Sequence, residues 1–268
     1  MRRSRLSLAL VALLLTPGCK STMQSALEAD RKATEPSPLT ADLVDYRNGL
    51  SMLREGRVDE AIQQLSAARK SYPRNAEVAN ALGLALLYRK DYPNATRLFS
   101  EALALDPVLI EALNNRGVAA MEAGKLAEAE TDFLAVLAQP KTAEYVNARF
   151  NLGLLRSRQL RWAEAERELT TVLADDAGYT KAARERGLAR MKLEDFRGAL
   201  EDFLLVLREE SKDPVSNYNA ALCLLTTDRR DLAVRYMERT VQAAPESEEA
   251  RKARRFLGGE SFQPGRER

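Results

Sequence analysis

The sequence predicts an all-α solenoid of six helix–turn–helix repeats, closed by a C-terminal capping helix. The first observation behind this prediction is a period of thirty-four residues, which begins at Asp42 and runs through most of the chain. The second is a set of fixed positions, here called columns, that hold small or large apolar residues in every repeat. The third is composition, because Ala, Leu, Glu and Arg abound and all favour helices. Such a period is typical of stacked helix pairs that bury one continuous core.

Three columns identify the repeats. We expect blocks at residues 42–75, 76–109, 110–145, 146–179, 180–213 and 214–247, with a two-residue insertion near Pro140. The eighth column holds Gly49, Gly83, Gly117, Gly153, Gly187 and Ala221. The twentieth column holds Ala61, Ala95, Ala129, Ala165, Ala199 and Ala233. The twenty-fourth column holds Leu65, Phe99, Phe133, Leu169, Phe203 and Met237. We expect the small residues to let paired helices approach closely, and the large residues to fill the space between pairs.

Residues typical of turns and of helix ends support the same repeat boundaries. The turns between paired helices carry Gly56, Asp91, Gly124, Asp195 and Asp228. Second helices end before Pro73, Pro107 and Pro245, because proline cannot continue a helix. Residues 246–258 predict the capping helix, with acidic side chains in its first turns and basic ones later, as the helix dipole prefers. Residues 259–268 are expected to form a disordered tail.

The N-terminal residues predict export. Residues 1–18 place three arginines before the apolar run from Leu6 to Leu15 and close it with small residues, which is the pattern of a secretory signal peptide. The apolar run is too short for a stable membrane-spanning helix. The polar residues that follow, up to Ala41, include Pro36 and Pro38 and indicate a tether.

Cys19 predicts a lipid anchor at the start of a segment spanning residues 19–41. The stretch from Leu15 to Cys19 resembles a bacterial lipobox, which implies diacylation of Cys19 as the mature N-terminus. Pro17 departs from the usual pattern, and the alternative is an incidental cysteine beside an ordinary cleavage site. More than one acyl chain holds a protein stably on a membrane. Lys20 stands in place of the aspartate associated with inner-membrane retention, which favours the outer membrane.

The residue inventory argues against an enzyme. The chain has no histidine and only two cysteines, Cys19 and Cys223, so it offers neither a structural zinc site nor histidine-assisted nucleophilic catalysis. Pairs of carboxylates occur, but no site constellation surrounds them. We therefore expect no catalytic activity, no cofactor and no metal. Without Arg2, Arg3 and Arg5 of the signal peptide, 38 basic residues face 39 acidic ones, which argues against nucleic acid as a partner.

The repeat resembles the tetratricopeptide repeat, a helix–turn–helix of about 34 residues. The resemblance covers Asp42 to Ser247 and rests on the three columns above. It implies a right-handed superhelix whose concave groove is lined by first-helix positions two, five, nine, twelve and thirteen. The fourth column lacks the family's usual tryptophan, and the third to fifth blocks lack proline in the thirty-second column.

The groove positions supply a candidate partner-binding surface. Its residues are Tyr46, Leu50, Asn80, Leu84, Tyr88, Asn114, Met121, Asn147, Phe150, Arg158, Arg184 and Tyr218. We expect the aromatic members to be exposed anchors for a partner, whereas the alternative for the aliphatic members is packing against the adjacent helix. Tetratricopeptide co-chaperones hold the C-terminal carboxylate of a chaperone with lysine, asparagine and arginine side chains at set groove columns. In the first block of this chain the corresponding columns hold Tyr46 and Leu50, so that carboxylate clamp is absent. An apolar groove with scattered amides favours an extended or helical apolar segment.

The lipid anchor, the tether and the six repeats together resemble the PilF, PilW and Tgl pilotins, which are lipoproteins of type IV pilus systems. This resemblance implies a protein anchored in the outer membrane and facing the periplasm. It also implies that the protein partner is a secretin subunit, whose assembly and outer-membrane localisation the pilotin promotes. The alternative is an envelope adaptor that recruits a periplasmic peptidase or a cell-wall hydrolase.

The lipid anchor can be tested at Cys19. The Cys19→Ala substitution removes the thiol that would carry the diacylglycerol, so we expect the protein to leave the membrane fraction. Fractionation of the cell envelope followed by immunoblotting measures this change. Retention of the variant in the outer-membrane fraction would contradict the anchor.

Overall fold

A computed structural model describes residues 43–139 and 143–259, and all regular structure in these two ranges is helical. The helices of this part of the chain are α2 (Val44–Arg54), α3 (Val58–Ser71), α4 (Ala76–Tyr88), α5 (Tyr92–Leu105), α6 (Ile110–Glu122), α7 (Leu126–Leu137), α8 (Ala143–Arg158), α9 (Trp162–Asp175), α10 (Thr180–Lys192), α11 (Phe196–Glu209), α12 (Pro214–Thr226), α13 (Arg230–Ala243) and α14 (Glu248–Leu257). The all-α prediction is confirmed. The predicted signal peptide, Cys19, the tether, the insertion near Pro140 and the tail from Glu260 lie outside the described residues.

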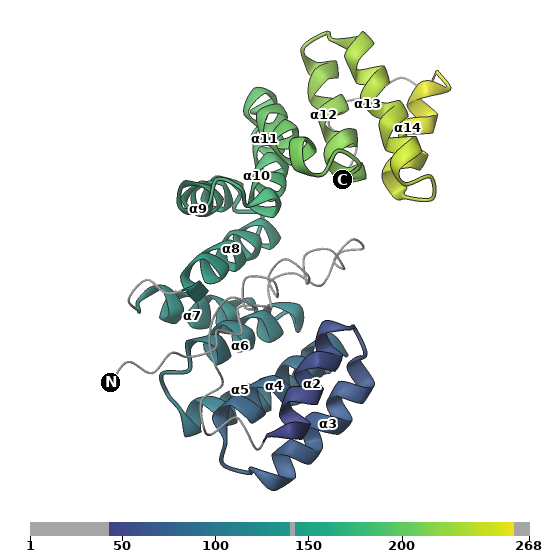
Figure 1. The fold of residues 1–268 in the computed structure, drawn as a ribbon. Helices are drawn as coiled ribbons and strands as arrows, with labels where there is room; N and C mark the ends of the chain where they lie inside the picture. The colour runs from purple at the N-terminus through teal and green to yellow at the C-terminus, as the bar shows by residue number, and fades with distance from the viewer. Residues whose placement is uncertain (1–42, 140–142, 260–268) are drawn as a thin grey trace. The chain divides into compact units, whose positions relative to one another are not determined.

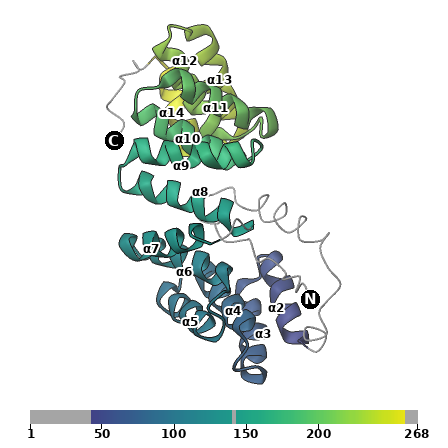
Figure 2. The ribbon, with the colours of Figure 1, turned by 90° about the vertical axis from the view of Figure 1, so that its left-hand side faces the viewer.

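The chain divides into two compact units, which are described separately. Unit 1 runs up to Leu155 and unit 2 begins at Arg156. In unit 1, α2 packs on α3, α4 on α5 and α6 on α7, while α3 also contacts α4 and α5 contacts α6. In unit 2, α10 packs on α9 and α11, α12 packs on α11 and α13, and α14 contacts both α13 and α12. Within each unit a helix therefore contacts chiefly its neighbours in sequence, as expected for a repeat stack (Figures 1 and 2).

Four first helices begin where the period places a block. Helices α4, α6, α10 and α12 begin at Ala76, Ile110, Thr180 and Pro214. Helix α8 differs, because it begins at Ala143, three residues before the expected block start at Val146.

The physical reason is that the residues after the insertion add a turn to α8, with Glu144 in that first turn. The Glu144 side chain is buried and its Oε2 accepts a hydrogen bond from Asn114 Nδ2 at 3.3 Å, so the added turn is tied to α6.

Glycine in the eighth column allows the two helices of a repeat to touch. A Cβ atom on Gly117 would lie 2.6 Å from Cε1 of Phe133, and one on Gly83 would lie 2.8 Å from Cε1 of Phe99. All six alanines of the twentieth column are fully buried. The sixth repeat combines Ala221 with Met237 instead, and the flexible methionine makes room for the extra methyl group. The packing expected from these columns is thus present.

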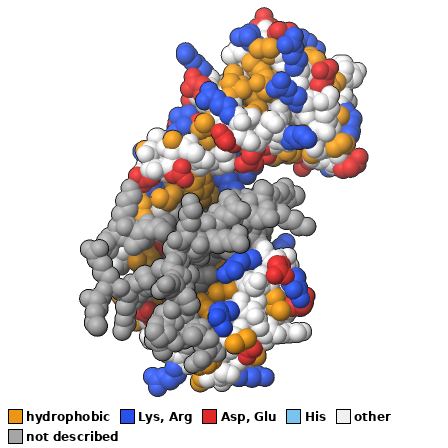
Figure 3. All heavy atoms as spheres, in the orientation of Figure 1, with side chains coloured by type: hydrophobic (Ala, Val, Ile, Leu, Met, Phe, Trp, Pro, Cys, Tyr) orange, Lys and Arg blue, Asp and Glu red, His pale blue; other side chains and the backbone are white. Residues whose placement is uncertain are grey.

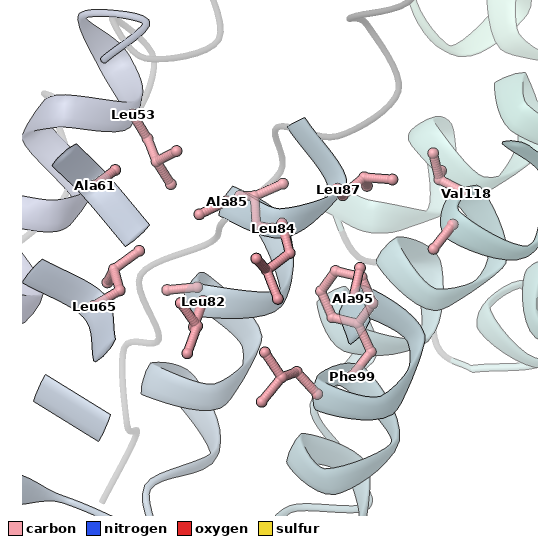
Figure 4. Close-up of a cluster of buried hydrophobic side chains, with 14 of the residues drawn as sticks. Leu53, Ala61, Leu65, Leu82, Leu84, Ala85, Leu87, Ala95, Phe99 and Val118 are labelled. Atoms are coloured by element: carbon pink, nitrogen blue, oxygen red, sulfur yellow. The ribbon is translucent and has the colours of Figure 1, made fainter. Parts of the chain in front are cut away.

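Large apolar side chains of the twenty-fourth column lie at the centre of each unit. In unit 1, Leu65 and Phe99 are completely buried and belong to a cluster with side chains from α2, α4 and α6 (Figure 4). In unit 2, Phe203 is buried beside Cys223, and Met237 is buried beside Tyr218 and Phe256. Burial raises the pKa of the Cys223 thiol to about 12, so this cysteine is an inert packing residue, as the sequence indicates.

In all six repeats, the residue in the fifteenth column lies in the turn between the paired helices and has a left-handed backbone conformation. Only two of these residues are glycines, Gly56 (φ 75°) and Gly124 (φ 78°). The others are Lys90 (φ 64°), Leu160 (φ 60°), Glu194 (φ 62°) and Asp228 (φ 57°). The predicted turn residues Asp91 and Asp195 lie in these turns and are N-caps, whose carboxylates accept hydrogen bonds from the backbone N–H of Asn94 and Gly198. Aspartate suits that role because its oxygen satisfies an otherwise unpaired helix N–H.

One polar arrangement recurs in both units. In unit 1, the Arg116 guanidinium donates to both oxygens of Asp132, at 2.9 and 2.7 Å, and to Oγ of Ser100 at 3.3 Å. In unit 2, Arg186 makes the same contacts with Asp202, at 3.0 and 2.6 Å, and with Oγ1 of Thr170 at 3.2 Å. Each arginine therefore ties together three helices from two successive repeats. Bidentate pairs of this kind fix orientation as well as adding energy.

The glycine contact can be tested at Gly117. The Gly117→Ala substitution forces a methyl group into the Phe133 ring, and such overpacking costs about 1–3 kcal/mol. This loss exceeds the gain in helix propensity, which is at most about 1 kcal/mol. We expect the midpoint of urea unfolding to fall. Adding Phe133→Met reproduces the combination of the sixth repeat and is expected to restore the midpoint, whereas a stabilising Gly117→Ala would contradict the contact.

The strain in the turns can be tested at Leu160, whose side chain is 70% exposed. A left-handed conformation costs a non-glycine residue roughly 1–2 kcal/mol, so Leu160→Gly is expected to raise the midpoint of thermal unfolding. The control is Leu193→Gly, since Leu193 is another exposed turn leucine but has φ −91°. We expect this control to be neutral or destabilising. Equal effects of the two substitutions would show that strain is not the cause.

Candidate partner-binding surfaces

The predicted groove residues lie on first helices, and most of them are more buried than expected. In unit 1 they come from α2, α4, α6 and α8, and in unit 2 from the end of α8, α10 and α12. The buried side chains are Tyr46, Asn80, Leu84, Asn114, Met121, Phe150 and Tyr218. The half-buried ones are Leu50, Tyr88, Asn147 and Arg184, and Arg158 is exposed. The expectation of an open groove lined by exposed anchors therefore needs correction.

The aromatic residues show why the predicted groove residues are more buried than expected. Tyr46, Phe150 and Tyr218 all occupy the fifth column and are 7%, 3% and 5% exposed. A large ring in this column packs within the stack rather than projecting from it. In unit 2, Tyr218 belongs to the cluster with Leu222 and Phe256, and the Lys252 ammonium lies 6.0 Å from its ring centroid. As exposed anchors these three aromatics were wrongly predicted, and only Tyr88 keeps a half-exposed position.

Asparagines form a buried ladder along the first helices of unit 1. Asn115 Nδ2 of α6 donates to Asn80 Oδ1 of α4 at 3.0 Å. Asn151 Nδ2 of α8 donates to Asn114 Oδ1 of α6 at 3.0 Å. All four side chains are at most 1% exposed. The sequence analysis missed Asn115 and Asn151 because they occupy the sixth column, although their recurrence one repeat apart was a visible signal.

The ladder does not satisfy all of its own hydrogen-bonding groups. Asn80 Nδ2, Asn115 Oδ1 and Asn151 Oδ1 are buried and have no hydrogen-bond partner among the described residues. One hydrogen bond between two amides leaves a group unused on each, whichever way the amides are oriented. A buried polar group without a partner costs about 1–3 kcal/mol. These groups are enclosed within the stack, so the ladder is a partly satisfied buried polar network.

The inner columns of unit 2 are more charged. Arg184 donates to Asp213 Oδ1 at 3.2 Å, and the other oxygen of Asp213 caps α12 by accepting from the Ser216 N–H at 2.8 Å. Arg184 thus has a structural partner. Its neighbour Glu185 has its pKa raised by burial, with Arg184 and Arg158 opposing that shift.

Apolar side chains also reach the surface of unit 2. Leu188 and Met191 of α10 and Leu225 of α12 are only partly buried against the core clusters. In the space-filling view, hydrophobic side chains gather over α12, with lysine and arginine side chains around them (Figure 3). This surface offers apolar contact with a basic border, which suits a protein segment better than a small polar ligand.

Within the described ranges, no helix has the length and apolar character needed to cross a membrane. In the same ranges, no three histidine, cysteine or acidic side chains come together as metal ligands. The features that the described residues do offer are the amide ladder of unit 1 and the apolar surface of unit 2.

Comparison with solved structures shows where this fold occurs. A structure from a functional characterisation of Pseudomonas aeruginosa PilF shares 21% identity, covers 81% of this chain and 96% of its own, and has a TM-score of 0.71. PilW, described as a widely conserved type IV pilus biogenesis factor, shares 21% identity over 81% and 99% of the two chains, with a TM-score of 0.72. YrrB, described as a TPR protein with an unusual peptide-binding site, shares 17% identity over 71% and 97%, with a TM-score of 0.55. At these identities the likeness shows the fold.

Comparison of the sequence itself gives the family. No curated protein matches the chain. The sequence profile of the tetratricopeptide repeat matches residues 46–110, 91–145, 114–179, 150–214 and 184–248, which together span most of the described helices. The chain belongs to the tetratricopeptide repeat family.

Proposed function

We propose that this protein is a pilotin, a lipid-anchored repeat protein that binds a secretin subunit and promotes assembly of the secretin ring of a type IV pilus in the outer membrane. The observation that carries the proposal is the likeness in fold to PilF and PilW, which extends over 81% of the chain. The predicted signal peptide and the lipobox-like stretch ending at Cys19 support the same assignment, because together they predict export and a lipid anchor.

The proposed mechanism divides the work between the repeats and the anchor. The repeats bind an apolar segment of a secretin monomer, and the acyl chains on Cys19 hold the complex at the membrane where rings form. A bound segment is also withheld from edge-to-edge pairing with other β-structure, which limits aggregation before the ring closes. No catalytic step is needed, because the protein acts by binding and by localisation.

The surface of unit 2 is the accessible part of this proposed binding site. Leu188, Met191 and Leu225 are partly exposed on first helices, where an apolar segment of the partner can bury them. Burial of apolar area contributes roughly 25 cal/mol per Å², so contact with a few such side chains is a substantial part of an affinity.

The pilotin proposal predicts the phenotype of a deletion. Loss of the gene is expected to abolish heat-resistant secretin multimers and surface pili while secretin monomers remain present. Immunoblotting of unheated and heated envelope samples measures the multimers, and electron microscopy scores the pili. Complementation with the wild-type gene is the control. Normal multimers in the deletion strain would refute the proposal.

A point variant makes the same test specific to the surface. Met191→Lys places a charge among the apolar side chains of unit 2 and is expected to lower multimer levels at unchanged protein abundance. Leu193→Lys is the matched control, because Leu193 is an exposed residue of the following turn. Equal multimer levels in the two variants would place the binding surface elsewhere.

A further inference from the structure

The apolar surface of unit 2, formed by Leu188, Met191 and Leu225, runs across two neighbouring first helices. Helices α10 and α12 contact one another, and Met191 of α10 and Leu225 of α12 pack against the same buried cluster. Helix α12 carries no charged side chain from Pro214 to Thr226. All three side chains that define the surface are partly exposed, so a partner has apolar area to bury on both helices.

Cations border this apolar surface. Along each first helix, columns two and five precede the apolar columns nine and twelve, and column thirteen follows them. Helix α14 begins at Glu248, where the period places a seventh block, and its Lys252 ammonium lies 6.0 Å from the ring centroid of Tyr218 on α12. Among the described residues of unit 2, Glu249 is the one acidic residue in these columns, and Glu185 lies in the adjacent column six. The basic residues in these columns, here called the basic border, are Arg158, Lys181, Arg184, Lys192 and Lys252.

The repeat stack itself does not require a basic border. In unit 1 the same five columns carry one basic residue, Arg54. They also carry three acidic residues, Glu77, Glu111 and Glu122. Both units nevertheless pack their helix pairs through the same eighth, twentieth and twenty-fourth columns. The sign of the charge in the inner columns therefore varies independently of the packing, as expected for positions that recognise a partner.

Lys192 is the cation of the border best placed to meet a partner. Its side chain is exposed, and it forms no ion pair within the part of the chain that the structure describes. Arg184 Nη1 lies 3.2 Å from Asp213 Oδ1. Lys252 Nζ lies 3.0 Å from Glu248 Oε1. These two pairs lower the net charge of the border and fix the positions of its cations, so the charge that is open to a partner is chiefly that of Lys192.

We propose that the apolar surface and the basic border of unit 2 together bind an acidic amphipathic segment of the partner. The apolar side chains of this segment bury Leu188, Met191 and Leu225, and its glutamate or aspartate side chains pair with the border at Lys192. A basic segment would bring like charges together, so the border selects between segments of equal apolar content. The partner is the secretin subunit if the proposed function holds, and on that point alone the inference rests on the proposed function.

A polypeptide fits this surface better than a lipid bilayer does. Insertion into a bilayer requires apolar side chains that project from the protein. Leu188, Met191 and Leu225 instead pack partly against the core clusters of unit 2. A segment that lies along the helices buries such side chains without needing them to project.

Fluorescence anisotropy with the full mature chain, purified from membranes in a non-ionic detergent, tests the inference. The probes are three fluorescein-labelled peptides of about fifteen residues, each with leucine at every third or fourth position. The remaining positions are all glutamate in the first peptide, all glutamine in the second and all lysine in the third. We expect the glutamate peptide to bind about tenfold more tightly than the glutamine peptide, and the preference to shrink at high salt because exposed charges are screened. Equal affinities, a preference for the lysine peptide or no binding of the glutamate peptide would overturn the inference.

Two charge reversals locate the binding site on the protein. Lys192→Glu is expected to weaken binding of the glutamate peptide several-fold and to leave binding of the glutamine peptide unchanged. Arg197→Glu is the matched control, because Arg197 is a cation of the second helix α11 whose side chain is 91% exposed. Equal effects of the two reversals would show that net charge alone matters, which contradicts a site at the border. Circular dichroism checks folding, and Lys192→Gln is the milder variant if Lys192→Glu does not fold.

An anionic lipid surface is the competing partner for a basic border. The Cys19→Ala variant, which lacks the proposed acyl chains, is mixed with phosphatidylglycerol vesicles and centrifuged through a density gradient. A chain that stays at the bottom of the gradient supports the inference. Flotation that Lys192→Glu abolishes would assign the border to lipid and overturn it.

The peptide measurement needs neither secretin nor pili, so the inference and the proposed function can fail separately. A preference for the glutamate peptide together with normal multimers in the deletion strain would remove the pilotin proposal alone. Three equal affinities together with secretin multimers that depend on this protein would remove the inference alone.

Discussion

The separation of the two helices in each repeat is set where the eighth column meets the twenty-fourth. At Gly83, Gly117 and Gly187 a phenylalanine ring occupies the space that a side chain would need. The alanines of the twentieth column permit the same approach from the second helix, and all are fully buried. Because each repeat packs mainly on its neighbours, the spacing set within a pair is passed on to the pairs stacked against it. In the sixth repeat Ala221 and Met237 take the places of glycine and phenylalanine and are also buried, which is in keeping with a conserved summed volume.

Polar contacts fix the relative orientation of helices whose separation the apolar contacts set. Apolar contacts alone allow packed helices to shift along one another. A guanidinium that donates two hydrogen bonds to one carboxylate favours a single orientation. Arg116 and Arg186 occupy the same column in the third and fifth repeats, and each also reaches a hydroxyl of the preceding repeat. The asparagine ladder does the same between first helices of unit 1. These ties hold the first helices at fixed positions, so the inner face is a preorganised surface.

The two units use one backbone plan to present different chemistry. Unit 1 presents buried amides and aliphatic side chains in its inner columns, and unit 2 presents partly exposed apolar side chains beside Arg184, Glu185 and Lys192. A repeat protein can vary such columns freely, since they do not determine the spacing of the helices. The columns that keep the stack together say nothing about the partner, and the inner columns carry that information.

The sequence by itself determined the period, the all-helical class and the start of most first helices, because these follow from residue spacing within one repeat. It also located the capping helix, whose Ser247 caps the N-terminus and whose charges follow the dipole. Local turn chemistry was predicted less well, since Lys90 and Glu194 adopt the left-handed conformation without any glycine signal.

Only the tertiary structure decided which side chains face a partner and which face each other. The period places Asn80 and Asn114 in a groove column, yet it does not show that Asn115 and Asn151 reach across to them. It also does not show that rings in the fifth column pack inward, as at Tyr46, Phe150 and Tyr218. The physical reason is that a column fixes the direction of a side chain relative to its own helix. Its burial depends on what residues more than thirty positions away place beside it.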